Sequence, residues 1–144
     1  LIKDTIFIRF LHLWGMNKTY SLLGAIAICF GIVIGAFGAH GLKESLNISE
    51  FASFEVGVRY QIYHGLAMLI LGINAKKVGL NSYCIWGFSI GTILFSFSIY
   101  LLSADRALSV DLSFIGPITP IGGGILIISW FYLNDHIAKS KGNC

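Results

Sequence analysis

Two histidines inside or beside apolar segments are the residues of this sequence best suited to chemistry. His40 follows a run of small residues in "GAFGAHGLK" (35–43), and His64 ends the stretch "FASFEVGVRYQIYH" (51–64). An imidazole can ligate a metal ion, exchange a proton or hydrogen-bond to a neighbouring helix. The surrounding residues decide which of these roles the sequence supports.

The spacing of the remaining polar residues argues against a reaction centre. His40, His64 and carboxylates such as Glu55 or Asp105 could supply metal ligands, but no HxxH or HExxH spacing preorganises them. A serine nucleophile lacks the GxSxG motif, although Ser103 could lie near His64. We therefore predict no catalytic residue, no metal site and no cofactor, and an enzyme is the third-ranked hypothesis.

Four apolar segments must position these residues. The chain of 144 residues is 56% hydrophobic and 12% charged, and its mean hydropathy is +0.78, whereas a soluble domain is about a quarter charged. The segments cover residues 20–37, 58–75, 83–102 and 114–133, and a bilayer core needs about 20 helical residues. We predict an all-α fold, an integral membrane bundle of four transmembrane helices.

The domain organisation follows from these segments. Residues 1–15, "LIKDTIFIRFLHLWG", mix charged and apolar side chains and precede Met16, which resembles an ordinary start. We interpret residues 1–15 as a non-native or upstream extension. Residues 16–138 then form a single four-helix transmembrane domain, and residues 139–144 form a basic C-terminal tail.

Small and hydroxyl-bearing residues recur along the first and third segments at steps of three and four residues. Close backbone approach drives helix association in lipid, so the first set is predicted to be a packing interface. It comprises Gly24, Ala27, Gly31, Gly35 and Gly38. The second set should point into the bundle and comprises Ser89, Thr92, Ser96, Tyr100 and Ser103.

Four spans place both termini and the second loop on one side of the membrane. From Met16 onward that side carries five lysines and the other side three basic residues. The positive-inside bias therefore predicts cytoplasmic termini. The two groups are Lys18, Lys76, Lys77, Lys139 and Lys141 against Lys43, Arg59 and Arg106.

This topology gathers polar residues at the non-cytoplasmic end, where Thr119 before Pro120 is predicted to cap the fourth helix. Two helix N-termini and two arginines would favour an anion there, such as a lipid headgroup. A quinone-like polar ring is the other ligand that this polar end could bind. The simpler alternative is structural, with the histidines tying loops together. The predicted cluster comprises His40, Arg59, Tyr60, Gln61, His64, Ser96 and Thr119.

Four ordered motifs add a family resemblance. They are "GAFGAHGLK" (35–43), "VGVRYQIYHGLAML" (56–69), "GTILFSFSIYLL" (91–102) and "ITPIGG" (118–123). In order and spacing they resemble the small inner-membrane family of unknown function typified by bacterial YgdD and YwdK and by eukaryotic transmembrane protein 256. The resemblance implies a four-helix membrane protein beginning near Met16 and brings no assigned reaction. Val56 and Phe97 depart from its usual threonine and glycine.

These observations predict a small membrane protein of unknown function in a bacterial plasma membrane, with cytoplasmic termini. The first hypothesis is a non-enzymatic structural or interaction protein whose polar cluster lies at the non-cytoplasmic end. The alternative is a binder or transporter of a small molecule or a lipid headgroup. The expected partners are membrane lipids, with a homo-oligomer or a larger membrane complex also open and with no nucleic acid.

Overall fold

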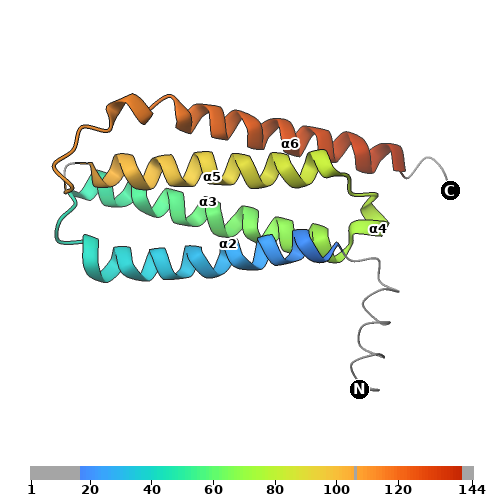
Figure 1. Ribbon diagram of the computed structural model, residues 1–144, viewed down its shortest axis with the longest axis horizontal. Coiled ribbons are helices and arrows are strands. Elements are labelled where there is room, and N and C mark those ends of the chain that lie inside the picture. The colour runs from blue at the N-terminus through green and yellow to red at the C-terminus, as the bar shows by residue number, and fades with distance from the viewer. Residues whose placement is uncertain (1–16, 106, 141–144) are drawn as a thin grey trace, which may run out of the picture.

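The computed structural model describes residues 17–105 and 107–140, and in this part of the chain all regular elements are helical (Figure 1). Four long helices are long and apolar enough to cross a membrane. They are α2 (Lys18–Phe37), α3 (Ile48–Ile73), α5 (Ser82–Ala104) and α6 (Ile118–Ser140). The predicted all-α fold with four transmembrane helices is confirmed. The prediction for residues 1–15 lies outside the described residues.

Three asparagines determine where helices begin. The side chains of Asn17 and Asn81 accept hydrogen bonds from backbone nitrogens in the first turns of α2 and α5. Asn47 does the same for α3 and exchanges a second bond with Glu50, which completes a capping box. Such caps satisfy backbone donors that the helix itself leaves free.

Two helices extend beyond the predicted apolar segments. Helix α3 begins at Ile48 rather than near residue 58. Asn47 caps it there, and a stretch of mixed polar and apolar residues forms its first turns before the apolar run begins. Helix α6 continues past Leu133 to Ser140 in an exposed polar stretch, where Lys139 bonds to Asp135 at 2.6 Å. Residues 139 and 140, assigned above to the tail, are therefore helical.

The long helices pack in the order α2, α3, α5, α6 (Figure 1). The start of α2, the short helix α4 (Ala75–Val78) and the end of α6 lie at one end of the bundle. The π-helix η1 (Gly38–Leu42) and the 3₁₀-helix η2 (Ser113–Ile115) lie in the connections at the other end. Successive long helices are thus antiparallel, as four consecutive membrane spans require.

Glycines allow α2 and α3 to approach closely. A methyl group added to Gly24 would lie 2.5 Å from the Leu69 nitrogen and 2.6 Å from the Gly65 carbonyl oxygen. Because these neighbours are backbone atoms, α2 and α3 could not keep this separation with a larger residue at position 24. Three further glycines face side chains of α3 and are Gly31, Gly35 and Gly38.

Candidate functional site

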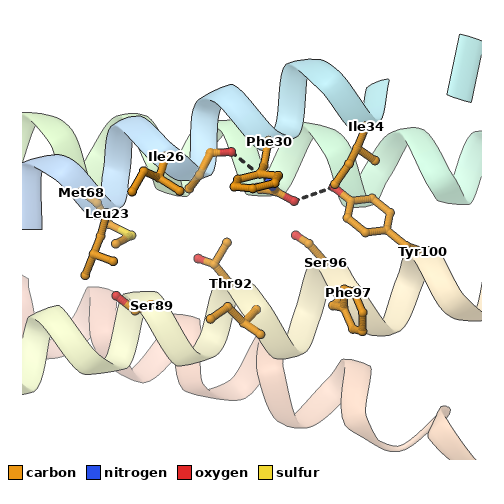
Figure 2. Close-up of a pocket in the computed structure, with 13 residues that line it drawn as sticks. Leu23, Ile26, Phe30, Ile34, Met68, Ser89, Thr92, Ser96, Phe97 and Tyr100 are labelled. Atoms are coloured by element: carbon orange, nitrogen blue, oxygen red, sulfur yellow. Dashed lines mark hydrogen bonds between the residues drawn. The ribbon is translucent and has the colours of Figure 1, made fainter. Parts of the chain in front are cut away.

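A cavity of about 330 Å³ lies where α2, α3 and α5 meet (Figure 2). We call it the α2–α5 groove and define it by Ala27 and Phe30 of α2, Gln61 of α3, and Ser96 and Tyr100 of α5. Most of its remaining lining is aliphatic. Its mouth carries Phe30 together with Phe97 of α5, which are 60% and 58% exposed. The groove therefore combines an apolar lining with a small polar surface.

Helical periodicity places the polar groups of the groove on one face of α5. Ser89, Thr92, Ser96 and Tyr100 follow one another at steps of three and four residues, and all four line the groove. Residues at these steps share one side of a helix. Figure 2 shows the hydroxyl groups of the first three along the edge of α5 that borders the groove.

One amide joins the three helices around the groove. The Gln61 nitrogen donates a hydrogen bond to the Ala27 carbonyl oxygen of α2 at 2.9 Å. The Tyr100 hydroxyl of α5 donates to the Gln61 amide oxygen at 2.8 Å (Figure 2). The oxygen and the nitrogen of the Gln61 amide thus each have a partner on another helix. Polar groups in the membrane interior need such partners within the protein.

Ser96 differs from the other hydroxyls of this face. Ser89 and Thr92 donate to the carbonyl oxygens four residues earlier, at 2.8 and 2.7 Å, which is the usual solution for a hydroxyl inside a helix. The Ser96 side chain is 2% exposed, and its oxygen has no hydrogen-bond partner among the described residues. Tyr20 and Ser103 also carry such hydroxyls, but neither lines the groove.

An unpartnered buried hydroxyl is energetically unfavourable. Leaving a hydroxyl without a hydrogen bond in an apolar environment costs about 1–3 kcal/mol. Ser96 could also rotate toward the carbonyl four residues earlier, as its neighbours do. A molecule in the groove would therefore have to offer a better acceptor than that carbonyl.

His64 makes a separate polar contact between α3 and α6. The side chain is 7% exposed. Its Nε2 accepts a hydrogen bond from the Trp130 indole nitrogen at 3.2 Å, and its Nδ1 lies 2.8 Å from the Tyr60 carbonyl oxygen. An indole nitrogen only donates and a carbonyl only accepts. The contacts therefore assign the proton to Nδ1 and a neutral ring to His64.

The other residues of the predicted cluster lie in four further places. The Tyr60 ring is partly exposed and packs against Phe95 of α5, with 5.0 Å between the ring centroids. Thr119 pairs with the hydroxyl of Ser98 at 2.8 Å, joining α6 to α5. Arg59 borders a smaller cavity of about 140 Å³ with Glu55. His40 is exposed within η1. Only Gln61 and Ser96 of the predicted cluster line the α2–α5 groove.

One detail differs from the sequence-based expectations. Helix α6 begins at Ile118, so Thr119 lies in its first turn instead of capping it.

Sequence reasoning missed Trp130 and the Ala27 carbonyl. Trp130 is the partner of His64 and lies in an apolar segment with no polar periodicity. The Ala27 carbonyl belongs to the backbone and leaves no mark on the sequence. Among the described residues, no three histidine, cysteine, aspartate or glutamate side chains lie together as a metal site would require.

Comparison with known proteins relates this chain to membrane proteins without an assigned function. The family described as "Protein of unknown function (DUF423)" matches residues 34–123. A UPF0382 membrane protein of Staphylococcus haemolyticus is 35% identical over 126 residues, which cover 87% of this chain and 99% of that protein. The UPF0382 membrane protein YwdK of Bacillus subtilis is 36% identical over 119 residues, covering 81% and 93%. No solved structure matches the chain.

These matches confirm the resemblance inferred from the four motifs. A UPF0382 membrane protein of Staphylococcus aureus is 37% identical and also aligns over 126 residues, which cover 87% of this chain and 99% of that protein. The chain is a small membrane protein of unknown function that belongs to the DUF423 family and is related to the UPF0382 membrane proteins.

Proposed function

We propose that this protein is a non-enzymatic membrane protein that binds a lipophilic small molecule in the α2–α5 groove. The observation that carries the proposal is the buried, unpartnered hydroxyl of Ser96 at the groove. A hydroxyl in this position gains a hydrogen bond when a ligand supplies an acceptor, and it gains none from the protein as it stands.

The composition and size of the groove support this proposal. Small-molecule sites are concave, mostly apolar and about 300–1,000 Å³ in volume, with a few polar groups that orient the ligand. The α2–α5 groove has about 330 Å³ and polar groups on two of its three helices, from Gln61 of α3 and the hydroxyl face of α5. The exposed Phe30 and Phe97 at its mouth favour entry from the lipid phase.

A structural role is the second candidate function, and the contact between His64 and Trp130 favours it. This contact links α3 to α6 without a cavity, as a fixed connection between helices would. Under this alternative the protein serves as a packing or interaction partner for lipids, for other copies of itself or for a larger membrane complex. The groove would then carry no specific small molecule.

The proposal is tested by the molecules that accompany the native protein. The protein is extracted from its own membranes in polymer-bounded lipid discs, and the organic extract is analysed by mass spectrometry. Ser96→Phe fills the groove, whereas Ile90→Phe adds the same ring at a half-exposed position of α5 outside it. We expect one lipophilic compound, enriched over bulk lipid, that is lost in Ser96→Phe and kept in Ile90→Phe.

A wild-type extract that matches bulk membrane lipid would overturn the proposal and favour the structural role. Retention of the enriched compound by Ser96→Phe would also overturn it. Because Ser96 is buried, thermal unfolding of the variant checks its fold, and Ser89→Phe fills the groove from a half-buried position. Loss of the compound in both filled variants separates a blocked groove from a misfolded protein.

We also propose a bacterial plasma membrane location with cytoplasmic termini. The named relatives are bacterial membrane proteins. Among the described residues, the bundle end that holds the start of α2, helix α4 and the end of α6 carries Lys18, Lys76, Lys77 and Lys139, and a cytoplasmic excess of lysine and arginine is the general rule. Labelling of single cysteines from outside the cell tests the orientation.

A further inference from the structure

We infer that the ligand of the α2–α5 groove carries an uncharged carbonyl group of the quinone type, whose oxygen accepts a hydrogen bond from Ser96. This inference rests on the proposed binding function and names the chemical class of its ligand. It follows from which hydrogen-bonding groups of the groove lack partners, from their depth in the membrane and from the shape of the lining.

The groove has unused donors. The Ser96 hydroxyl has no partner, and Gln61 uses one of the two hydrogens on its amide nitrogen for the Ala27 carbonyl. No further protein partner of that nitrogen is found among the described residues. The hydroxyl hydrogens of Ser89 and Thr92 are already bonded. The groove therefore needs a ligand that brings an acceptor.

A carbonyl oxygen meets this need better than a hydroxyl group. It offers two lone pairs and brings no donor hydrogen of its own. An orphaned donor is rarer in buried sites than an acceptor with a spare lone pair. The spare lone pairs of Ser89, Thr92 and Tyr100 can remain unused, whereas the Ser96 hydrogen gains a bond from the ligand.

The depth of the groove disfavours a charged headgroup. Helix α5 spans Ser82–Ala104, so its midpoint is Ile93, and Ser96 lies about 4.5 Å beyond it at 1.5 Å per residue. Gln61 is near the middle of α3 (Ile48–Ile73). Charged groups are costly at this depth. A phospholipid ester carbonyl would bring its headgroup there, whereas a ring carbonyl on an apolar molecule brings none.

The lining favours a ring. Phe30 and Phe97 extend from α2 and α5 at the mouth of the groove (Figure 2), and aromatic side chains pack well against planar rings in offset or edge-on arrangements. A volume of about 330 Å³ is at the lower end for a ligand pocket. It suits one small ring with a tail that runs into the lipid between the two helices.

Three probes that share a decyl chain and a six-membered ring, and that differ in the polar groups on the ring, test the inference. The full-length protein, with its three cysteines replaced by alanine so that no thiol can add to the quinone, is placed in nanodiscs of palmitoyl-oleoyl phosphatidylcholine. It is equilibrated with 2-decyl-1,4-benzoquinone, with 4-decylphenol or with decylbenzene. Bound probe is measured against empty nanodiscs, which corrects for partition into lipid. Ser96→Ala removes only the donor, and Ser129→Ala is the matched control because Ser129 is also buried but bonds within α6.

We expect the wild-type protein to bind the benzoquinone roughly three- to tenfold more tightly than decylbenzene, the ratio given by one neutral hydrogen bond. Ser96→Ala should abolish this advantage without unfolding the protein, since it removes an unpartnered group. Ser129→Ala should keep it. The infrared carbonyl band of the bound benzoquinone should lie at lower frequency in the wild-type protein than in Ser96→Ala.

The outcomes separate this inference from the proposed function. Equal binding of benzoquinone and decylbenzene, blocked by Ser96→Phe, would refute the carbonyl and leave groove binding intact. Stronger binding of decylphenol with the same dependence on Ser96 would assign a hydroxyl ligand instead. Binding of the benzoquinone that Ser96→Ala does not change would remove Ser96 as the donor. Failure of all three probes to bind, with no enriched compound in the native extract, would refute both proposals.

Discussion

The hydroxyl of Tyr100 on α5 donates a hydrogen bond of 2.8 Å to the side-chain oxygen of Gln61 on α3. Since the nitrogen of the same amide donates to Ala27 on α2, one side chain connects three helices. These bonds span the end of the α2–α5 groove where Ser96 lies (Figure 2). They hold the groove at the width that the structure shows.

The contact between Gln61 and Tyr100 should be measurable as a coupling energy. We expect Gln61→Leu and Tyr100→Phe each to lower the free energy of unfolding. The double variant should lose less than the sum, by about 0.6 kcal/mol, the average for hydrogen bonds between membrane helices. Unfolding in mixed micelles, followed by circular dichroism, gives the four values. Simple additivity would contradict a direct bond between the two side chains.

His64 should be neutral with its proton on Nδ1. Its Nε2 accepts from Trp130, and its Nδ1 faces the Tyr60 carbonyl. Nitrogen-15 NMR at neutral pH should show an unprotonated Nε2. His136 is the internal control, because its Nε2 lies 2.6 Å from the Gly79 carbonyl and must carry a hydrogen.

Trp130→Phe removes the donor and keeps a ring. We expect it to lower the free energy of unfolding by about 1 kcal/mol, because the buried Nε2 of His64 loses its bond. The tautomer of His64 should then be less uniform in the nitrogen-15 spectrum. An unchanged spectrum in Trp130→Phe would show that the indole does not determine the tautomer.

Gly24 should be intolerant of a methyl group. In Gly24→Ala the new carbon would collide with backbone atoms of Leu69 and Gly65, so α2 and α3 must move apart. We expect a loss of about 1–3 kcal/mol in the free energy of unfolding, the range for overpacked interiors. Gly124→Ala is the matched control, because nothing lies within 4 Å of the added carbon. It should be neutral or stabilising by up to about 1 kcal/mol. Similar losses in both variants would argue against the close packing of α2 on α3.

The proposed orientation predicts which loops are accessible from outside the cell. In a background with all three cysteines replaced by alanine, Ser45→Cys and Ser109→Cys place single exposed thiols in the connections that carry η1 and η2. A membrane-impermeant maleimide should label both in intact cells. Lys77→Cys, at the opposite end of the bundle, should react only after lysis. The reverse pattern would place the termini outside.

The sequence predicted several residues of the candidate site, but it did not predict which of them contact one another. Gln61 and Ser96 belonged to the predicted polar cluster, and periodicity placed Ser89 and Thr92 on the same face as Ser96. The sequence grouped His64 with Gln61. Three residues rotate a helix by about 300°, which leaves the two side chains about 60° apart around the axis. That angle is enough for Gln61 to meet α2 and α5 while His64 meets Trp130 of α6.

The sequence by itself determined that this chain is helical and membrane-embedded. Apolar segments of spanning length must satisfy their backbone groups internally, and helices do this without a partner. Asparagine caps then set where three of the helices begin. Only the tertiary structure decided which polar residues meet, because the order α2, α3, α5, α6 and the rotation of each helix depend on side-chain packing over the whole interface. For the same reason, only the tertiary structure showed that Ser96 borders a groove between α2 and α5 and that its buried hydroxyl has no partner.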